Sequence, residues 1–321
     1  MRVTTAGQTH SIITRLQTAS RRLEEAQRRA ITGKKSETLS EDPTVGSAVM
    51  QSAAGLRGVT QYQRNVDRVR TSLDAADAVL QQLGEITARA RELGVAANSA
   101  TSNAQARAAS AREVHALLGQ AVALGNTRLG DGYLFGGASN DGRPPFTRDA
   151  TPWVPADPPP AGSPPGTPDV PRFPTGALEV EAGAGGQRLL GAHDGTSVFL
   201  GRAPDGTPDP AAGVLPALRA LLDALEGGQQ ADVATALGTL ERADAGLQAT
   251  VGEVGARQNH ADTLAGGLAA LQETLARQQS ELSEVDAEQA ITEMAARQTA
   301  YQAAMLASSK VLAVSLADYL R

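Results

Sequence analysis

The chain has 321 residues, of which 41% are hydrophobic and 20% charged, a balance typical of soluble, folded proteins. Its net charge of −6 gives no reason to expect nucleic-acid binding, which needs clustered lysine and arginine. The absence of cysteine excludes disulfides, thiolate zinc sites and cysteine nucleophiles. We also expect no membrane insertion and no cleaved signal peptide, because no stretch has the apolar length that either needs.

Residues 8–31 predict a first amphipathic helix that ends near Gly33, a residue type that commonly terminates helices. Its small and apolar residues follow the alternating steps of three and four that mark a coiled-coil seam: Ile12, Leu16, Ala19, Leu23, Ala26 and Ala30. Three of these six are alanine, so the seam buries little surface. An isolated helix of this length is marginal in water.

The first helix is basic, and the entry to the last helix is acidic. Residues 1–35 hold eight lysines and arginines against two glutamates, whereas residues 281–293 hold five acidic residues and no basic one. One interpretation is that the two segments pair with each other. The other is that each is a separately solvated face, because exposed ion pairs contribute little to stability.

The sequence Ser40-Glu41-Asp42-Pro43 predicts a helix start, with Asp42 as N-cap and Pro43 in the first helical position. A mostly heptad pattern of apolar residues then predicts one helix over 43–98, about 80 Å long. A compact domain cannot enclose such a helix, so we expect a rod.

A third helix is predicted at about 104–126, before a glycine-rich corner at 130–137. Residues 138–212 differ in kind, because they hold fifteen of the seventeen prolines, which excludes long helices. We predict a small β-rich domain with a mobile proline-rich loop at about 151–175. Its strand candidates are Ala177–Glu181, Arg188–Leu190 and Ser197–Leu200, with a turn at Asp194-Gly195.

Helix resumes at about 214–226, and a heptad run after Asp232 leads into a closing helix. The closing helix carries a second seam with steps of three and four: Ile291, Met294, Gln298, Tyr301, Met305, Ser308 and Leu312. Seams at both ends of the chain predict that the ends meet, within one molecule or between molecules.

The predicted fold class is therefore mainly α, an elongated antiparallel helical rod or coiled coil built from both chain ends. A small β-rich, proline- and glycine-rich domain is inserted in the middle. We expect terminal assembly helices at 1–42 and 286–321, a helical rod domain at 43–137 and 213–285, and the inserted domain at 138–212.

The sequence carries no pattern typical of a catalytic or metal site. The four histidines lie in different segments without a ligand-spaced neighbour. The run Gly183-Ala184-Gly185-Gly186 resembles a phosphate loop only superficially, because no Lys-Ser/Thr and no helix follow it. We expect no enzyme activity, no cofactor and no metal.

Five features, in order along the chain, resemble those of the flagellar hook–filament junction proteins, the hook-associated protein 3 family within the wider flagellin-like group. They are Met1-Arg2-Val3-Thr4-Thr5, Thr32-Gly33-Lys34-Lys35, Ser40-Glu41-Asp42-Pro43, Gly132-Tyr133-Leu134-Phe135-Gly136-Gly137 and Ser315-Leu316-Ala317-Asp318-Tyr319-Leu320. The resemblance covers roughly 1–137 and 240–321. The final Arg321 and the proline-rich loop depart from the family's pattern.

The resemblance implies a structural component of the bacterial flagellum, exported unfolded through the flagellar type III apparatus by an uncleaved signal. It implies an extracellular place at the hook–filament junction, in a ring of copies between the first hook-associated protein and flagellin. A cytoplasmic export chaperone is expected to hold the C-terminal helices. We expect assembly to depend on Ile12, Leu16, Leu23, Ile291, Met294, Tyr301, Met305, Leu312 and Leu316.

Two alternatives remain. Flagellin itself shares the helical frame, although the Asp-Tyr-Leu close and the Ser-Glu-Asp-Pro start favour the junction protein. A long helical signalling rod would also show extended heptads, but it would need a transmembrane segment or a sensory domain. In either flagellar case, we hypothesise that the terminal helices are disordered or loosely paired in the monomer and become ordered on assembly.

Overall fold

The computed structural model describes residues 5–35, 43–99, 102–137, 143–147, 156–157, 170–171, 179–183, 185–191, 195–201, 209 and 212–319. Side chains are described in these ranges except at 5–9, 156–157, 170–171 and 311–319. The α-helices in this part of the chain are α1 (Thr5–Thr32), α2 (Pro43–Ala97), α3 (Ala104–Gly125), α4 (Val214–Gly227), α5 (Gln230–Ser283) and α6 (Ala287–Tyr319). Each lies within a few residues of a predicted helix.

The described strands form three two-stranded antiparallel sheets. They pair β1 (Arg128–Leu129) with β2 (Gly132–Tyr133), β3 (Ala156–Asp157) with β4 (Val170–Pro171), and β5 (Glu179–Glu181) with β6 (Arg188–Leu190). The predicted fold class is thus confirmed: long helices come from both chain ends, and small strands lie in the middle. Apart from β3 and β4, the loop predicted at 151–175 lies almost wholly outside the described residues, as does Asp194 of the predicted turn.

The predicted strand Ser197–Leu200 is wrong, because Thr196–Leu200 forms a single π-helical turn, η1. Gly195 and Gly201 flank this turn with φ values of 71° and 72°, a left-handed conformation that glycine adopts readily. Val198 and Phe199 are buried within it. A short apolar run does not distinguish a buried strand from a buried helical turn, which explains the error.

The structure divides into two compact units. One comprises Met1–Thr60 with Ala270–Arg321, and the other comprises Gln61–Ala269. The long helices α2 and α5 contribute residues to both.

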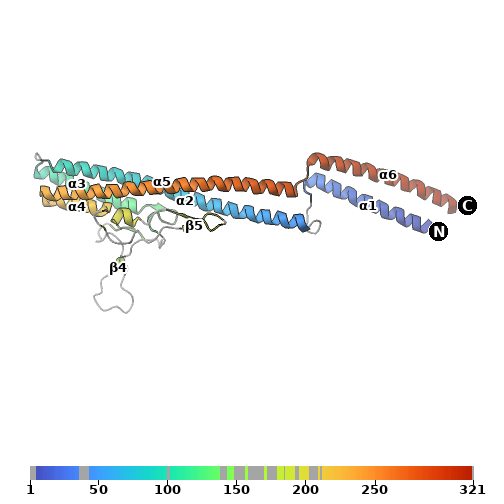
Figure 1. Ribbon diagram of the computed structural model, residues 1–321, viewed down its shortest axis with the longest axis horizontal. Helices are drawn as coiled ribbons and strands as arrows, with labels where there is room; N and C mark the ends of the chain where they lie inside the picture. Colours follow the sequence, from blue (N-terminus) through green and yellow to red (C-terminus); the bar gives the residue numbers. More distant parts are fainter. Residues whose placement is uncertain are drawn as a thin grey trace, which may run out of the picture. The chain divides into compact units, whose positions relative to one another are not determined.

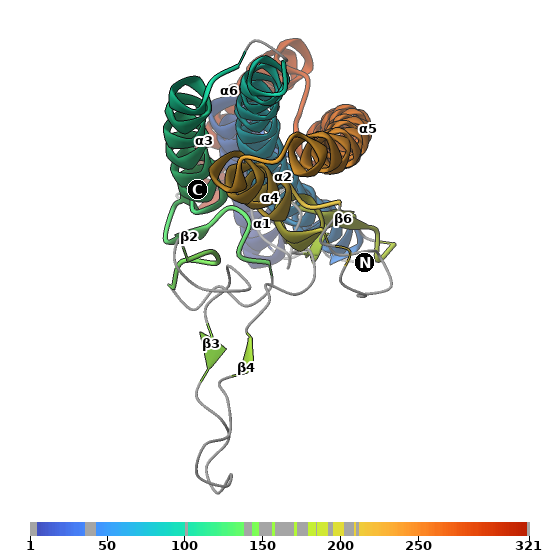
Figure 2. The same ribbon diagram turned by 90° about the vertical axis from the view of Figure 1, so that its left-hand side faces the viewer.

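The unit of residues 61–269 holds the larger core. Figure 2 shows α2, α3, α4 and α5 nearly end-on, with α4 beside α3. Polar contacts join α2 to α5 antiparallel, at matched levels: Arg70–Asp262 (2.8 Å), Asp74–Gln258 (2.9 Å), Thr87–Asp244 (3.2 Å) and Arg91–Glu241 (2.8 Å). The core of this unit includes leucines of α2, α4 and α5 that are at most 1% exposed: Leu73, Leu80, Leu83, Leu215, Leu218, Leu221, Leu240 and Leu247.

Three phenylalanines attach the inserted segment to this core. The Phe199 ring lies 5.1 Å from the Phe135 ring and 4.9 Å from the Phe146 ring, and all three are buried. The side chain of Asn126, at the end of α3, donates to the Phe146 carbonyl (2.7 Å) and accepts from its N–H (3.0 Å). A Cβ at Gly125 would lie 2.7 Å from the Phe146 ring, so glycine permits this close approach. Phe146 is therefore fixed near the end of α3 both through its backbone, by Asn126, and through its ring, by Phe199.

Candidate assembly surface

The candidate site is the helix pair formed by α1 and α6, which belong to one unit and lie side by side (Figure 1). The pair is antiparallel, because the end of α1 meets the start of α6. Val285 donates its N–H to the Gly33 carbonyl, and Lys35 donates its N–H to the Ser283 carbonyl, both at 2.8 Å. The two sequence-distant ends of the chain therefore do meet within one molecule.

Both helix breaks occur at this joint for identifiable reasons. Gly33 follows α1 with φ of 68°, and its N–H donates to the Arg29 carbonyl (2.9 Å), so it ends the helix as predicted. The Asp286 carboxylate accepts from the Glu288 N–H (2.9 Å) and so caps the start of α6. An isolated bridge between Lys34 and Glu284 links the two breaks. The joint thus fixes the level at which α1 and α6 begin to pair.

The predicted seam of α1 is the face that the structure covers. All six seam residues are buried or half-buried, and Ala26, at 3% exposed, is the most buried residue described in this helix. Ile12, Leu16 and Leu23 lie among them and are half-buried. By contrast, Ile13 and Ile31 lie off the seam and are 48% and 83% exposed.

The predicted seam of α6 is only half correct. Met294, Tyr301 and Ser308 are half-buried, whereas Ile291 and Met305 are 57% and 51% exposed and Gln298 is also exposed. The covered seam instead combines the first three with a different set, namely Ala290, Arg297 and Ala304. Leu312 and Leu316 lie in the part of α6 whose side chains the structure does not describe.

Two heptad stripes on α6 therefore share Met294, Tyr301 and Ser308 and differ in their other positions. One is completed by Ala290, Arg297 and Ala304, and the other by Ile291, Gln298 and Met305. The predicted seam corresponds to the second, more apolar stripe. The α1 seam is rich in alanine, and small residues let helix axes approach closely, so α1 packs on the alanine stripe. Both stripes have the same spacing of seven residues, so the spacing alone could not have identified the covered one.

Charged contacts across the α1/α6 pair are few. Arg29 lies 3.9 Å from Glu293, which also pairs with Arg297 on its own helix at 3.2 Å. The Lys35 ammonium donates to the carbonyl oxygen of Glu281, not to a carboxylate. The predicted match between the basic first helix and the acidic run is thus represented by the Arg29–Glu293 contact.

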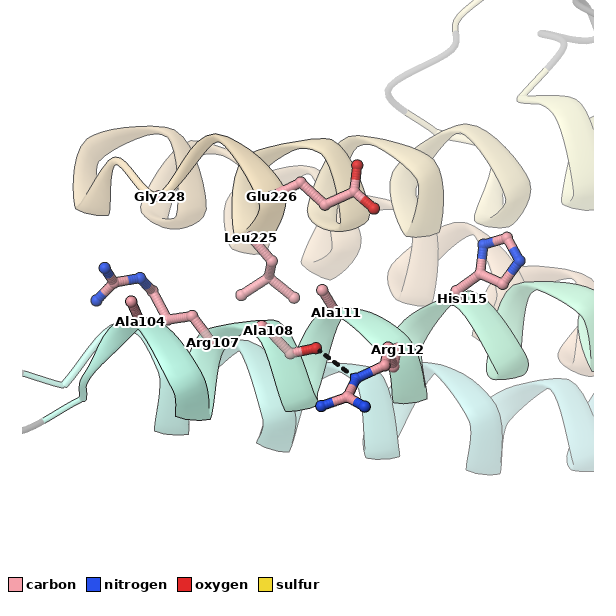
Figure 3. A pocket seen from close by; sticks show the side chains of 9 residues that line it. All are labelled: Ala104, Arg107, Ala108, Ala111, Arg112, His115, Leu225, Glu226 and Gly228. Atoms are coloured by element: carbon pink, nitrogen blue, oxygen red, sulfur yellow. Dashed lines mark hydrogen bonds between the residues drawn. The ribbon is translucent and has the colours of Figure 1, made fainter.

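Outside this pair, a groove of about 750 Å³ lies between α3 and α4 (Figure 3). Arg107, Arg112 and His115 line it from α3, and Glu226 faces them from α4. The Arg112 Nε donates to the Ala108 carbonyl (3.2 Å), so it is occupied by its own helix. The groove brings together no nucleophile and base in the manner of a hydrolytic site.

Within the described ranges, no group of three or more His, Asp or Glu side chains is placed to hold a metal ion. Across the same ranges, no helix is both long and apolar enough to cross a membrane. The expectation that the chain is not an enzyme stays a prediction.

Family comparisons match the two helical ends of the chain. Residues 3–139 match the bacterial flagellin N-terminal helical region, and residues 237–320 match the bacterial flagellin C-terminal helical region. Between these two regions lies most of the proline-rich insertion. No curated protein sequence matches the chain.

Solved structures share the fold at low sequence identity. A chain described as a flagellar hook-associated protein from Vibrio parahaemolyticus aligns with a TM-score of 0.62 and 17% identity, over 76% of this chain and 100% of that one. Bacillus cereus FlgL aligns with a TM-score of 0.55 and 20% identity, over 72% and 99%. Xanthomonas campestris FlgL aligns with a TM-score of 0.55 and 15% identity, over 71% and 99%. With both terminal helical regions of flagellin present on this fold, the chain belongs to the flagellin-like structural proteins of the bacterial flagellum.

Proposed function

We propose that this protein is the adaptor at the junction between hook and filament, and that it polymerises through its terminal helices. The observation that carries the proposal is the stripe of Ile291, Gln298 and Met305 on α6. The three residues are spaced seven apart. Ile291 and Met305 are large, apolar and more than half exposed. A helix face with coiled-coil spacing that no described helix of its own chain covers is suited to pack against another subunit.

Assembly through this stripe has a physical driving force. Burying one large apolar side chain contributes about 1.5–3 kcal/mol, and Ile291 and Met305 each leave about half of that unrealised in the single chain. The seam between α1 and α6 is rich in alanine, so it stabilises the pair only weakly in the single chain. A neighbouring subunit packed on Ile291 and Met305 would stabilise the pair further. Coupling helix order to assembly in this way limits premature polymerisation of the free subunit.

The junction role also defines the partners and the location of the protein. We propose that a ring of copies contacts the first hook-associated protein on the hook side and flagellin on the filament side. The chain reaches this extracellular site through the flagellar type III apparatus, and a cytoplasmic chaperone holds its C-terminal helices beforehand. The fold shared with FlgL and with the Vibrio hook-associated protein supports this role over a general flagellar one.

Deletion of the gene tests the junction role. We expect cells that keep their hooks but lack filaments and release unassembled flagellin into the medium. Electron microscopy of the cell surface and immunoblotting of the medium measure the two results, and re-expression of the chain is the control. Normal filaments on the deletion strain would refute the role.

Flagellin itself is the second candidate, favoured by the two flagellin regions that the chain matches. The two roles differ in copy number, because a filament contains thousands of subunits and a junction ring about a dozen, as the family resemblance implies. Quantitative mass spectrometry of isolated flagella, scaled to a hook protein, separates them.

A further inference from the structure

A basic groove runs along the α1/α6 pair. It is about 660 Å³ in volume and is lined by Arg15 and Arg22 from α1 and by Arg297 and Ala300 from α6. Arg15 and Arg22 are seven residues apart and therefore lie on one face of α1. Both are exposed, and neither forms an ion pair within the described part of the chain.

Charge is strongly segregated along this helix pair. The half that includes the groove, residues 10–22 and 294–310, holds four arginines and one lysine and no acidic residue. The half next to the joint, residues 23–35 and 281–293, holds seven acidic and four basic residues, a net charge of −3. The pair therefore has a positive half and a negative half, although the whole chain is only modestly acidic.

Arg15 and Arg22 cannot reach the acidic joint within one molecule. The joint places Glu284 and its neighbours level with Gly33, through the Val285–Gly33 hydrogen bond. At 1.5 Å per helical residue, Arg22 is about 16 Å and Arg15 about 27 Å along the axis from that level. An arginine side chain does not span such a gap. Consistent with this, Glu281, Glu284 and Glu288 are exposed and form no ion pair with any described residue.

We propose that the basic groove of one copy binds the acidic joint segment, Glu281 to Glu288, of a second copy of this chain. The second copy is displaced along the helix axis by about 20 Å, the distance between the two charged halves. The inference rests on the self-assembly in the proposed function and adds the partner segment and the stagger to it. The occupant is a second copy because the complementary charge is on the same helix pair.

A staggered contact of this kind is heterologous, because the basic half of each copy meets the acidic half of the next. Two joined copies therefore leave one basic half and one acidic half free, and such contacts continue into a closed ring or an open helix. Parallel copies placed level with each other would instead bring like charges together. The charge pattern thus selects one stagger and disfavours the aligned arrangement.

Charge reversal in the full-length chain tests the proposal. We expect Arg15→Glu with Arg22→Glu to weaken self-association by about 100-fold at low salt, because like charges then face each other. Glu281→Lys with Glu288→Lys should weaken it to a similar extent. Sedimentation equilibrium at protein concentrations up to the millimolar range measures the association constant.

Mixing the two charge variants provides the decisive measurement. In the mixture, the reversed groove of one variant meets the reversed acidic segment of the other, so association should return to within about tenfold of the unchanged chain. Arg68→Glu with Arg112→Glu is the matched control, because it makes the same change in net charge on exposed residues of the other unit. Circular dichroism of each variant checks that the helices remain folded.

Cross-linking gives an independent measure of the stagger. The chain has no cysteine, so Arg22→Cys in one copy and Glu288→Cys in another supply unique thiols. A thiol-specific linker shorter than about 10 Å should join the two copies and should fail within one doubly substituted copy, where the level difference is about 12 Å.

Three results would overturn the proposal: no association of the unchanged chain at low salt, no effect of the arginine reversals, or no recovery on mixing. Loss of binding to another flagellar subunit with self-association intact would mean that the groove faces that protein instead. A failed mixing experiment would leave the junction role standing. Normal filaments after gene deletion would refute the junction role without bearing on the charges.

Discussion

The α1/α6 pair and the helices at 61–269 differ in how much they bury. In α4, five residues between Val214 and Leu221 are 0% exposed: Val214, Leu215, Ala217, Leu218 and Leu221. In the described residues of α1 and α6, only Ala26 and Ala290 are less than 9% exposed. A helix with neighbours on several sides can bury several of its faces, whereas a helix with one neighbour buries one stripe.

This difference indicates where the chain is stable by itself and where it depends on other subunits. Alanine has little side-chain area to remove from water, so the two best-buried positions of the α1/α6 pair contribute little. Leucines at most 1% exposed each contribute about 1.5–3 kcal/mol to the other unit. The chain thus keeps its large apolar contacts in one unit and leaves the pair marginal.

The largest expected difference is in amide hydrogen exchange of the purified monomer. We expect amides of residues 8–30 and 290–319 to exchange at least about 100-fold faster than those of α4, because local opening of the pair exposes little apolar surface. Mass spectrometry of the exchanged chain measures both regions in one sample, and α4 is the internal control. Strong protection of the two terminal segments would contradict the hypothesis that they await assembly.

The next prediction compares the same truncation in the two regions. Leu218→Ala, at a position 0% exposed, should lower the free energy of unfolding by about 2–5 kcal/mol. Leu23→Ala, on the half-buried seam of α1, should lower it by less than about 1 kcal/mol. Urea unfolding followed by circular dichroism measures both. Equal losses would show that the pair shares the stability of the core.

The fold was largely predictable because long helices carry a periodic signal over many residues. Pro43 and Gly33 then supplied sharp boundaries, and both lie where expected. The turn at Thr196–Leu200 was not predictable, because its conformation depends on contacts with Phe135 and Phe146. Short segments take their structure from tertiary packing, which the local sequence does not record.

The candidate site was predicted less well than the fold, for two reasons. The α1 seam has one apolar stripe and could be identified. The α6 helix has two stripes with three residues in common, and choosing between Ala290 and Ile291 needs the shape of the facing helix. The basic groove combines Arg15 and Arg22 with Arg297, some 275 residues away along the chain. No spacing rule links residues that distant, so only the pairing of the helices reveals the groove.

A smaller effect is expected from removing equivalent helix caps in the two regions. Asn103 caps α3 by accepting from the Ala106 N–H (2.7 Å), and Asp286 caps α6 by accepting from the Glu288 N–H (2.9 Å). Asn103→Ala should lower the global free energy of unfolding by about 1 kcal/mol. Asp286→Ala should instead reduce helical content without shifting the main unfolding transition, because α6 opens locally. A shift of the main transition by both variants would show that the two regions unfold together.

The smallest effects are expected from single ion pairs. Arg91→Ala removes the 2.8 Å contact with Glu241 between α2 and α5, and should lower the free energy of unfolding by about 0.5 kcal/mol, as both side chains are more than half exposed. Arg29→Ala removes the 3.9 Å contact with Glu293 between α1 and α6, and should have no measurable effect. Glu293 keeps Arg297 as a partner at 3.2 Å, so no carboxylate is left unpaired. A loss above about 1 kcal/mol for Arg29→Ala would show that the charges of the pair stabilise the free subunit. Those charges would then already be engaged within one molecule, and fewer of them would remain available for a neighbour.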